Sequence, residues 1–292
     1  MQAMKPTVDA FIEEHREDSD AELAQALVRA TGLGALLTRD AGLDIHQKAN
    51  IADVVTQADL WAEDFTGTVL RTLRPNDGLL GEEGTDHASD SGRTWVIDPV
   101  DGTFNFAAGM DYFCSALALV HGDPADPRAV EFGAVHRPVT NTTWFGGAGL
   151  GTTVYQHGDP NDPTAGTRAR HLPPLPRGSR AKNMENSGLA TYLHPSFYSE
   201  PVFDVWRGLV PCFATFRTLG SASIDLAQLS AGVIDAWAQI KVCDWDWLPG
   251  RGLIEGVGGT TRKITVQGIE WSLAGTDTVV AEMVEHLERS NS

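Results

Sequence analysis

Residues 95–103 constrain this chain more than any other stretch. An apolar run stops there at two carboxylates, Asp98 and Asp101, which flank a proline and precede Gly102 and Thr103. Two carboxylates three residues apart in a stiffened turn can converge on magnesium, which prefers oxygen ligands. If a helix begins after the turn, the free amides of Gly102 and Thr103 and the helix dipole can hold a phosphate. The stretch therefore predicts a metal and phosphate site at the end of a strand.

Two other interpretations of this stretch have to be weighed against a metal and phosphate site. Asp, Pro and Gly after a strand are also the residues of an ordinary turn. The haloacid-dehalogenase phosphatases carry an Asp-x-Asp-Gly-Thr loop with a nucleophilic Asp, but here the two acids stand one residue further apart. This spacing argues against an aspartyl-phosphate mechanism and favours metal-activated water.

Three other segments place acids next to apolar runs. Glu82 and Glu83 follow Leu79, Leu80 and Gly81, and residues 53–59 end at Asp59, which opens an amphipathic segment. Residues 243–250, Cys-Asp-Trp-Asp-Trp-Leu-Pro-Gly, put two more acids at the end of an apolar segment. Each segment alone has an ordinary explanation, because an acidic doublet is usually solvated and Asp often caps a helix.

Together these segments resemble the inositol monophosphatase family from about Lys48 to Gly259. The family signature W-[VI]-[IV]-D-P-[VI]-D-G-T-x-N-F is present without a gap as residues 95–106. The family's Lys, D-x-V-T-x-x-D and G-E-E motifs precede it in order, and its Gly-Thr/Ser-Ala loop and W-D motif match residues 220–222 and 245–246. The resemblance implies the α/β class, with the five-layered α-β-α-β-α sandwich of inositol monophosphatases and fructose-1,6-bisphosphatases.

The resemblance also implies a site for two or three Mg²⁺ ions. One ion would be bound by Glu82, Asp98 and the backbone carbonyl of Val100. A second would be bound by Asp98, Asp101 and Asp246, and a third, weaker ion would be reached from Glu82 largely through water. Because the acids of such a site repel one another, we expect it to be poorly ordered without metal.

In the implied reaction, metal-activated water attacks a phosphomonoester in line. Thr103 would hydrogen-bond to Asp59, and this pair would orient and help deprotonate the water, with Glu82 across from it. Contacts to the phosphate and to the alcohol side of the substrate are implied for eight residues: Asp101, Gly102, Thr103, Gly220, Ser221, Ala222, Gln239 and Asp246.

Two residues near these motifs, Asp244 and Lys48, can each be assigned more than one role. Asp244 competes with Asp246 for the last ligand position, and counting favours Asp246 because it directly follows the motif's Trp. Alternation along an extended strand end would point both side chains the same way, so Asp244 could still lie behind the ligands. Lys48 either contacts the outer water shell of the metal or is a plain surface charge.

Inositol 1-phosphate is the predicted substrate, although two departures from the family pattern leave others open. Many inositol-specific members have an acid seven residues before the motif aspartate, where this chain has Gln239, an amide that can still hydrogen-bond a hydroxyl. Residues 247–249, Trp-Leu-Pro, replace small residues and predict a bulkier wall near the site. Histidinol phosphate, a 3'-phosphoadenosine nucleotide and fructose 1,6-bisphosphate remain alternatives, as does a metal- or phosphate-binding protein without turnover.

Length and charge predict how the chain is organised and where it works. Its 292 residues, 42% hydrophobic, are enough for one globular unit of two packed halves. These are residues 1–157, with most metal ligands, and 179–292, with Asp246 and the substrate loop.

The net charge of −17 argues against nucleic acid or an anionic membrane as a partner. The acidic N-terminus lacks a long apolar core, so we expect a cytoplasmic protein. The family resemblance adds a homodimer and sensitivity to lithium.

Hydrophobic periodicity predicts the main elements between these motifs. Residues 158–178, rich in Pro, Gly, Asp and Arg, are expected to form a linker or mobile loop. Helices are expected at 20–38, 53–74 and 221–230, and strands at 96–97, 115–120, 129–136, 142–145 and 236–240, with a hairpin around Asn141 in an antiparallel sheet.

Overall fold

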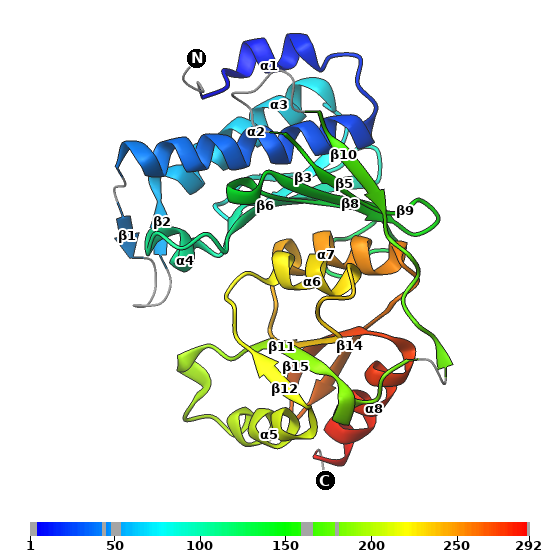
Figure 1. Ribbon diagram of the computed structural model, residues 1–292. Coiled ribbons are helices and arrows are strands. Elements are labelled where there is room, and N and C mark those ends of the chain that lie inside the picture. Colours follow the sequence, from blue (N-terminus) through cyan, green and yellow to red (C-terminus); the bar gives the residue numbers. More distant parts are fainter. Residues whose placement is uncertain (1–4, 43–44, 48–53, 159–165, 179–180, 291–292) are drawn as a thin grey trace.

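The computed structural model describes residues 5–42, 45–47, 54–158, 166–178 and 181–290. Its helices and strands form five layers, seen edge-on in Figure 1. Helices α1, α2 and α3 cover one face of an eight-stranded sheet, and α6 and α7 lie between that sheet and a five-stranded one. Helices α5 and α8 cover the outer face of the second sheet. The predicted α-β-α-β-α sandwich is therefore confirmed.

The outer helices are amphipathic, and their apolar faces pack on the first sheet. In α2, Ser19 and Glu22 form a reciprocal cap at the first turn, which satisfies free amides there. Leu23 and Leu27 lie on the buried face of this helix, in one core cluster with Trp95. The helices of this layer are α1 (Val8–Glu14), α2 (Asp20–Ala41) and α3 (Gln57–Leu73).

The helix predicted at residues 53–74 starts later than expected. Residue 53 lies outside the described residues, and β2 (Val54–Thr56) pairs with β1 (Ile45–Gln47) before α3 begins. The run Val-Val-Thr is β-branched and favours a strand. The Thr56 hydroxyl then accepts a hydrogen bond from the amide of Ala58, so this residue is the cap of α3.

The eight-stranded sheet has the spatial order β10-β9-β8-β7-β6-β5-β3-β4, and only its β3–β5 pair is parallel. Strand β5 lies inside the sheet, with Trp95 and Ile97 facing the outer helices and Val96 facing α6 and α7. This two-sided burial explains why residues 95–97 are all apolar. The strands are β3 (Gly78–Gly81), β4 (Asp86–His87), β5 (Arg93–Asp101), β6 (Cys114–His121), β7 (Ala129–Arg137), β8 (Thr142–Gly147), β9 (Gly151–Gln156) and β10 (Arg168–His171).

The predicted strands of this region are confirmed, and one predicted loop is wrong in part. Strands β7 and β8 form the expected antiparallel hairpin, with Asn141 at φ 45° in its turn. Residues 168–171, predicted to belong to a linker or mobile loop, instead pair with β9 as the edge strand β10. The alternating Arg-Ala-Arg-His sequence carries no apolar face, so its strand character could not be recognised from hydrophobicity.

The five-stranded sheet is mixed and has the order β12-β11-β13-β15-β14. Its outer face packs on α5 and α8 in a cluster that includes Leu189, Trp271 and Met283. The predicted strand at 236–240 is confirmed as β13. The elements are β11 (Gly188–Tyr192), α5 (Val202–Leu209), β12 (Thr215–Arg217), β13 (Ala236–Ile240), β14 (Thr260–Val266), β15 (Ile269–Gly275) and α8 (Asp277–Arg289).

The middle layer joins the two sheets and begins at the candidate site. Helix α6 (Ala222–Ser230) agrees with the helix predicted at 221–230 and is capped by the Ser221 hydroxyl, and α7 (Asp244–Gly256) packs on β7 of the first sheet. A short helix, α4 (Thr103–Ala107), follows β5 directly. Within the described ranges, no helix has the length and hydrophobicity needed to cross a membrane.

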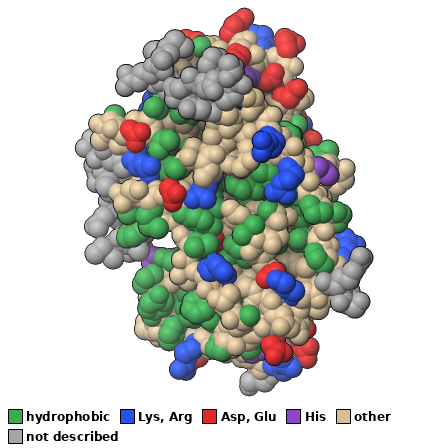
Figure 2. Space-filling model, viewed as in Figure 1, with side chains coloured by type: hydrophobic (Ala, Val, Ile, Leu, Met, Phe, Trp, Pro, Cys, Tyr) green, Lys and Arg blue, Asp and Glu red, His purple; other side chains and the backbone are tan. Residues whose placement is uncertain are grey.

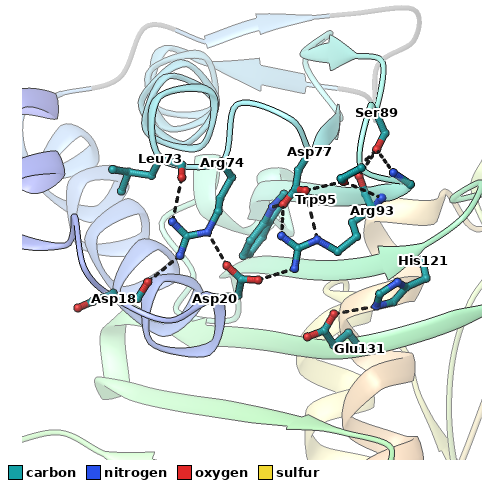
Figure 3. A network of polar contacts seen from close by, with 12 residues as sticks. Asp18, Asp20, Leu73, Arg74, Asp77, Ser89, Arg93, Trp95, His121 and Glu131 are labelled. Carbon is teal, nitrogen blue, oxygen red and sulfur yellow. Dashed lines mark hydrogen bonds and ion pairs between the residues drawn. The ribbon is translucent and has the colours of Figure 1, made fainter.

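A polar network fixes the start of β5 against the outer helices (Figure 3). The buried carboxylate of Asp77 accepts hydrogen bonds from the Trp95 indole at 2.9 Å and from the Arg93 guanidinium at 2.7 Å. Arg93 also reaches Asp20 at 2.6 Å, and Arg74 donates to the same carboxylate. Burial alone would raise the pKa of Asp20, but the hydrogen bonds and charges of the two arginines outweigh it and lower this pKa. The network therefore positions the strand that ends in Asp98 and Asp101.

We expect Asp77→Ala to destabilise the protein by about 3 kcal/mol, because it leaves Arg93 and the buried Trp95 indole without an acceptor. Urea denaturation followed by circular dichroism measures this change. Asp204→Ala removes an exposed ion pair with Arg207 and serves as the control, with an expected loss below about 0.5 kcal/mol. Equal losses in the two variants would contradict the structural importance of the network.

Candidate metal and phosphate site

Three carboxylates from two elements converge at the end of β5. Asp98 and Asp101 come from β5 and Asp246 from the first turn of α7, and one oxygen of each lies within 4.8 Å of the others. Residues three apart on a regular strand point to opposite faces. The pairing of β5 with β6 is irregular between Asp98 and Asp101, where Pro99 provides no amide for the ladder. This irregularity allows both acids to reach one centre.

Asp98 and Asp101 are buried, Asp246 is partly buried, and the cluster has few hydrogen-bond partners. One oxygen of Asp101 accepts hydrogen bonds from the Ser221 hydroxyl at 2.9 Å and the Ser223 amide at 2.6 Å, whereas Oδ1 of Asp98 has no partner among the described residues. Burial raises the pKa of Asp98 well above its usual value, and the charges of Glu82, Asp101 and Asp246 add to this shift. Burial likewise raises the pKa of Asp246 and of Asp101, although the serine bonds oppose the shift at Asp101.

This donor set fits a divalent cation. A buried carboxylate oxygen without a partner is costly unless a cation or a proton satisfies it. The described residues that line the adjoining cavity include no Lys or Arg to neutralise the acids. Clustered carboxylates are the ligands that Mg²⁺ and other hard cations prefer.

The predicted hydrogen bond between Thr103 and Asp59 is confirmed. The Thr103 hydroxyl lies 3.1 Å from Oδ1 of Asp59 and 3.0 Å from the carbonyl oxygen of Val100, so it can donate to either. Asp59 is only 1% exposed, and burial raises its pKa despite hydrogen bonds from Thr56 and Thr103. The Val100 carbonyl has a second lone pair, so its predicted role as a metal ligand stays compatible with this contact.

The turn between Asp101 and Thr103 requires glycine. Gly102 has φ 92°, and a Cβ there would lie 3.0 Å from the carbonyl oxygen of Gly220 and 3.1 Å from that of Tyr112. The side chain of Asn105 donates to the carbonyl of Tyr112 at 2.9 Å and to that of Leu219 at 2.8 Å. Asn105 therefore ties the turn to the loop before α6, a role that sequence reasoning missed although the residue belongs to the signature.

One cavity of about 360 Å³ collects the predicted substrate-binding residues. It also has an aromatic and polar wall that sequence reasoning missed, formed by Phe104, Tyr192, His194, Thr218 and Asp225. The pairing of Tyr192 with Gln239 in neighbouring strands brings Tyr192 to the site, and no local motif signals this contact. Of the predicted site residues, those on the cavity surface are Glu82, Asp101, Gly102, Thr103, Gly220, Ser221, Ala222, Gln239 and Asp246.

Asp225 is the titratable group of this wall whose pKa lies near neutrality. Burial raises the pKa of Asp225 to about 7, the hydrogen bond from the Tyr112 hydroxyl opposes this shift, and the charge of Asp101 adds to it. The hydroxyl and carboxyl groups are 2.7 Å apart.

Two sequence predictions beside the site are wrong, and one lies outside the described residues. Asp244 and Asp246 do not share a face, because residues 244–256 are helical and not an extended strand end, and Asp244 instead lies 3.6 Å from Lys263. Trp247 and Leu248 do not line the site cavity, and the Trp247 ring stacks on Trp237. Lys48 falls among the residues that the structure does not describe.

The structure defines a protein of layered α/β architecture with a cluster of acids that could hold a metal ion, and comparison with known proteins places it in a family. The inositol monophosphatase family model matches residues 17–290, so the chain belongs to this metal-dependent family. An inositol-1-monophosphatase from Rhizobium meliloti is 31% identical over 250 residues, 81% of this chain and 82% of that protein. A fructose-1,6-bisphosphatase/inositol-1-monophosphatase from Thermotoga maritima is 26% identical over 217 residues, 74% of this chain and 73% of that protein.

A solved structure agrees with this family at the level of the fold. The extragenic suppressor protein suhB from Bartonella henselae matches with a TM-score of 0.73 at 23% identity, over 90% of this chain and 96% of that chain.

The raised pKa values of the acid cluster give the metal-free protein a defined pH dependence. A carboxyl whose pKa is raised by folding stabilises the protein at pH values below its unfolded pKa, and this stability is lost as pH rises through the folded pKa. We therefore expect Asp98→Asn to stabilise the protein in EDTA, and to do so more at pH 8 than at pH 4.5. Thermal unfolding at the two pH values measures this difference.

The control for this experiment is Asp126→Asn, which changes an exposed acid outside the cluster. A gain for Asp98→Asn that is independent of pH, or equal to that of the control, would contradict the proposed electrostatic strain.

Proposed function

We propose that the protein is a magnesium-dependent phosphatase that hydrolyses a small phosphomonoester, with inositol 1-phosphate as the first candidate. The observation that carries this proposal is that Asp101, Asp246, Gly102 and Thr103 line one cavity, while Asp98 and Asp59 lie directly behind them, Asp98 in the carboxylate cluster and Asp59 hydrogen-bonded to Thr103. Membership of the inositol monophosphatase family supports a phosphomonoesterase. The names of the relatives support both inositol monophosphate and fructose 1,6-bisphosphate as substrates of related proteins.

The residues proposed to hold two or three Mg²⁺ ions are Glu82, Asp98, Asp101 and Asp246, together with the carbonyl oxygen of Val100. When bound, the ions supply the positive charge that attracts a phosphate and lowers the pKa of a water molecule. A chain of net charge −17 repels anions at long range, so this local charge is essential for binding an anionic substrate.

Thr103 and Asp59 are proposed to handle the proton of the attacking water. The Thr103 hydroxyl donates to Asp59 in the proposed state, so its oxygen presents a lone pair to the water. Burial raises the pKa of Asp59, which makes it a stronger proton acceptor than an exposed Asp. Glu82 lies on the same cavity surface and is proposed to orient the water from the other side. The amides of Gly102 and Thr103 are proposed to bind the phosphate oxygens.

The alcohol part of the substrate is proposed to lie against Gly220, Ser221, Ala222, Gln239, Asp101 and Asp246. The amide of Gln239 can donate to one hydroxyl and accept from another, which suits a polyol. Asp225 lies on the same surface and can accept from a further hydroxyl. These contacts support inositol 1-phosphate.

A second substrate class is supported by the aromatic wall. Phe104 is 59% exposed although it lines the cavity, and Tyr192 and His194 line it as well. Exposed aromatic rings can stack on a planar group and desolvate it. This observation favours histidinol phosphate or a 3'-phosphoadenosine nucleotide as the alternative substrate.

The location, oligomeric state and partners of the protein are part of the same proposal. We propose a cytoplasmic, lithium-sensitive homodimer of two packed halves per chain that binds neither nucleic acid nor membranes. The strongly acidic composition supports the absence of polyanionic partners, because nucleic acids and anionic membranes carry many negative charges that the chain repels at long range.

Thr103→Ala is expected to lower kcat for inositol 1-phosphate by roughly 100-fold or more, because it removes a group that handles the proton of the water. Thr103→Ser keeps the hydroxyl and serves as the matched control, with most of the activity retained. Phosphate release with saturating Mg²⁺ or with excess EDTA measures both effects.

Release that persists in EDTA would refute the metal-dependent mechanism. Wild-type protein that binds Mg²⁺ without hydrolysing any tested phosphomonoester would instead support a binding protein without turnover.

A substrate panel with a single variant separates the two substrate classes. Phe104→Ala should raise KM for histidinol phosphate or 3'-phosphoadenosine 5'-phosphate by about tenfold if the ring stacks on a planar group, since stacking is worth about 1 to 3 kcal/mol. The KM for inositol 1-phosphate and fructose 1,6-bisphosphate should stay unchanged. If inositol 1-phosphate has the highest kcat/KM of the wild-type panel, the first candidate is supported, whereas a preference for a planar substrate would replace it.

A further inference from the structure

A second cavity, of about 420 Å³, lies away from the acidic cluster, between the edge of the first sheet and the end of α6. It is comparable in size to the candidate active site and falls in the range of small-molecule sites. The described residues that line it include no Asp or Glu, although the chain as a whole carries a net charge of −17. They are Arg137, Thr140, Thr142, Trp144, Val154, Gln156, Arg168, Arg170, Gln228, Ala231 and Val233.

The register of the sheet places the basic residues of this cavity on one face. Arg168 pairs with Gln156 and Arg170 with Val154, and these residues of β9 pair in turn with Thr142 and Trp144 of β8. Directly opposed residues of neighbouring strands point to the same face. Both arginines of β10 therefore lie on the side of the sheet that carries Trp144.

The hydrogen-bond donors of this cavity have few partners within the protein. Arg168 and Arg170 are exposed and form no side-chain hydrogen bond or ion pair with the described residues. Trp144 is only 5% exposed, and its indole N–H has no partner in the described part of the chain. Arg137 differs, because it already pairs with Asp111 at 3.4 Å and lies over the Tyr112 ring. Unpaired donors that surround a cavity without an acid are suited to an anion.

Apolar side chains make up the other part of the lining. Val233 is 68% exposed, and Val154 and the Trp144 ring contribute further apolar surface. Figure 2, drawn from the same side as Figure 1, shows Lys and Arg side chains with hydrophobic side chains between them across the middle of the molecule. A bare phosphate would leave this surface exposed, whereas an organic phosphate could cover it.

We propose that this cavity binds an organic phosphate of about nucleotide size, as a site separate from the active site. Arg168 and Arg170 bind the phosphate groups, and the Trp144 indole and the amides of Gln156 and Gln228 provide further donors. The organic part lies against Val154 and Val233. The C-terminal end of α6 lines this cavity, while Ser221 and Ser223 at its N-terminal end bind Asp101, so one helix connects the two sites.

The test is calorimetric titration of the full-length protein with ADP in EDTA, where the uncompensated acids of the active site repel anions. Arg168→Gln/Arg170→Gln should weaken ADP binding by roughly 100-fold, about tenfold for each charge-assisted contact. Arg128→Gln/Arg262→Gln changes two exposed arginines that do not line the cavity, and it should bind ADP like the wild type. Equal affinities in wild type and the Arg168/Arg170 variant, or no binding by the wild type at millimolar ADP, would overturn the proposal.

Two further measurements distinguish an organic phosphate from a bare anion and from a second copy of the chain. Pyrophosphate should bind about tenfold more weakly than ADP, because it lacks an organic part, and equal affinities would overturn the assignment to an organic phosphate. In ¹⁵N spectra of the wild type, ADP should shift the Trp144 indole signal, identified with Trp144→Phe. If the Arg168/Arg170 variant instead changes the oligomeric state by sedimentation while ADP leaves this signal unmoved, the face is an interface between copies and the proposal fails.

Discussion

Repulsion among buried carboxylates is the constraint on which the rest of this structure depends. Asp98, Asp101 and Asp246 lie close together, and burial raises the pKa of each, with the charges of neighbouring acids adding to the shift at Asp98 and Asp246. Such an arrangement is unfavourable for an apo fold unless protons or cations compensate it. The cations of the proposed function would offset this repulsion.

The scaffold holds these acids from both sides of the molecule. The outer layer fixes the start of β5 through Asp77 and Trp95 (Figure 3), and the middle layer supplies Asp246 and the Ser221 hydroxyl. Because α6 and α7 pack against both sheets (Figure 1), the site is complete only when the layers are assembled. Folding and assembly of the site are thus coupled.

Local sequence signals predicted most of the helices and strands and the proposed metal ligands. They failed where contacts between segments far apart in the sequence determine the structure. Residues 95–106 indicate a strand, a turn and a short helix through apolar residues, Pro and Gly, so their structure could be predicted directly. Strand β10 has no apolar face, and only its pairing with β9 makes it a strand. Tyr192 and His194 reach the cavity through the parallel pairing of β11 and β13, a non-local contact that no motif encodes. Asp244 and Asp246 lie in the first turn of α7, where acids are favoured. The prediction of an extended strand end at these residues did not take account of this helix signal.

The most direct test of this account is a crystal structure with Mn²⁺, located by its anomalous scattering. Manganese shares the preference of magnesium for carboxylate oxygens. The account predicts anomalous peaks between the carboxylates of Asp98, Asp101 and Asp246, with Oδ1 of Asp98 as a ligand. Peaks elsewhere on the surface, or these three side chains turned away from a common centre, would contradict it.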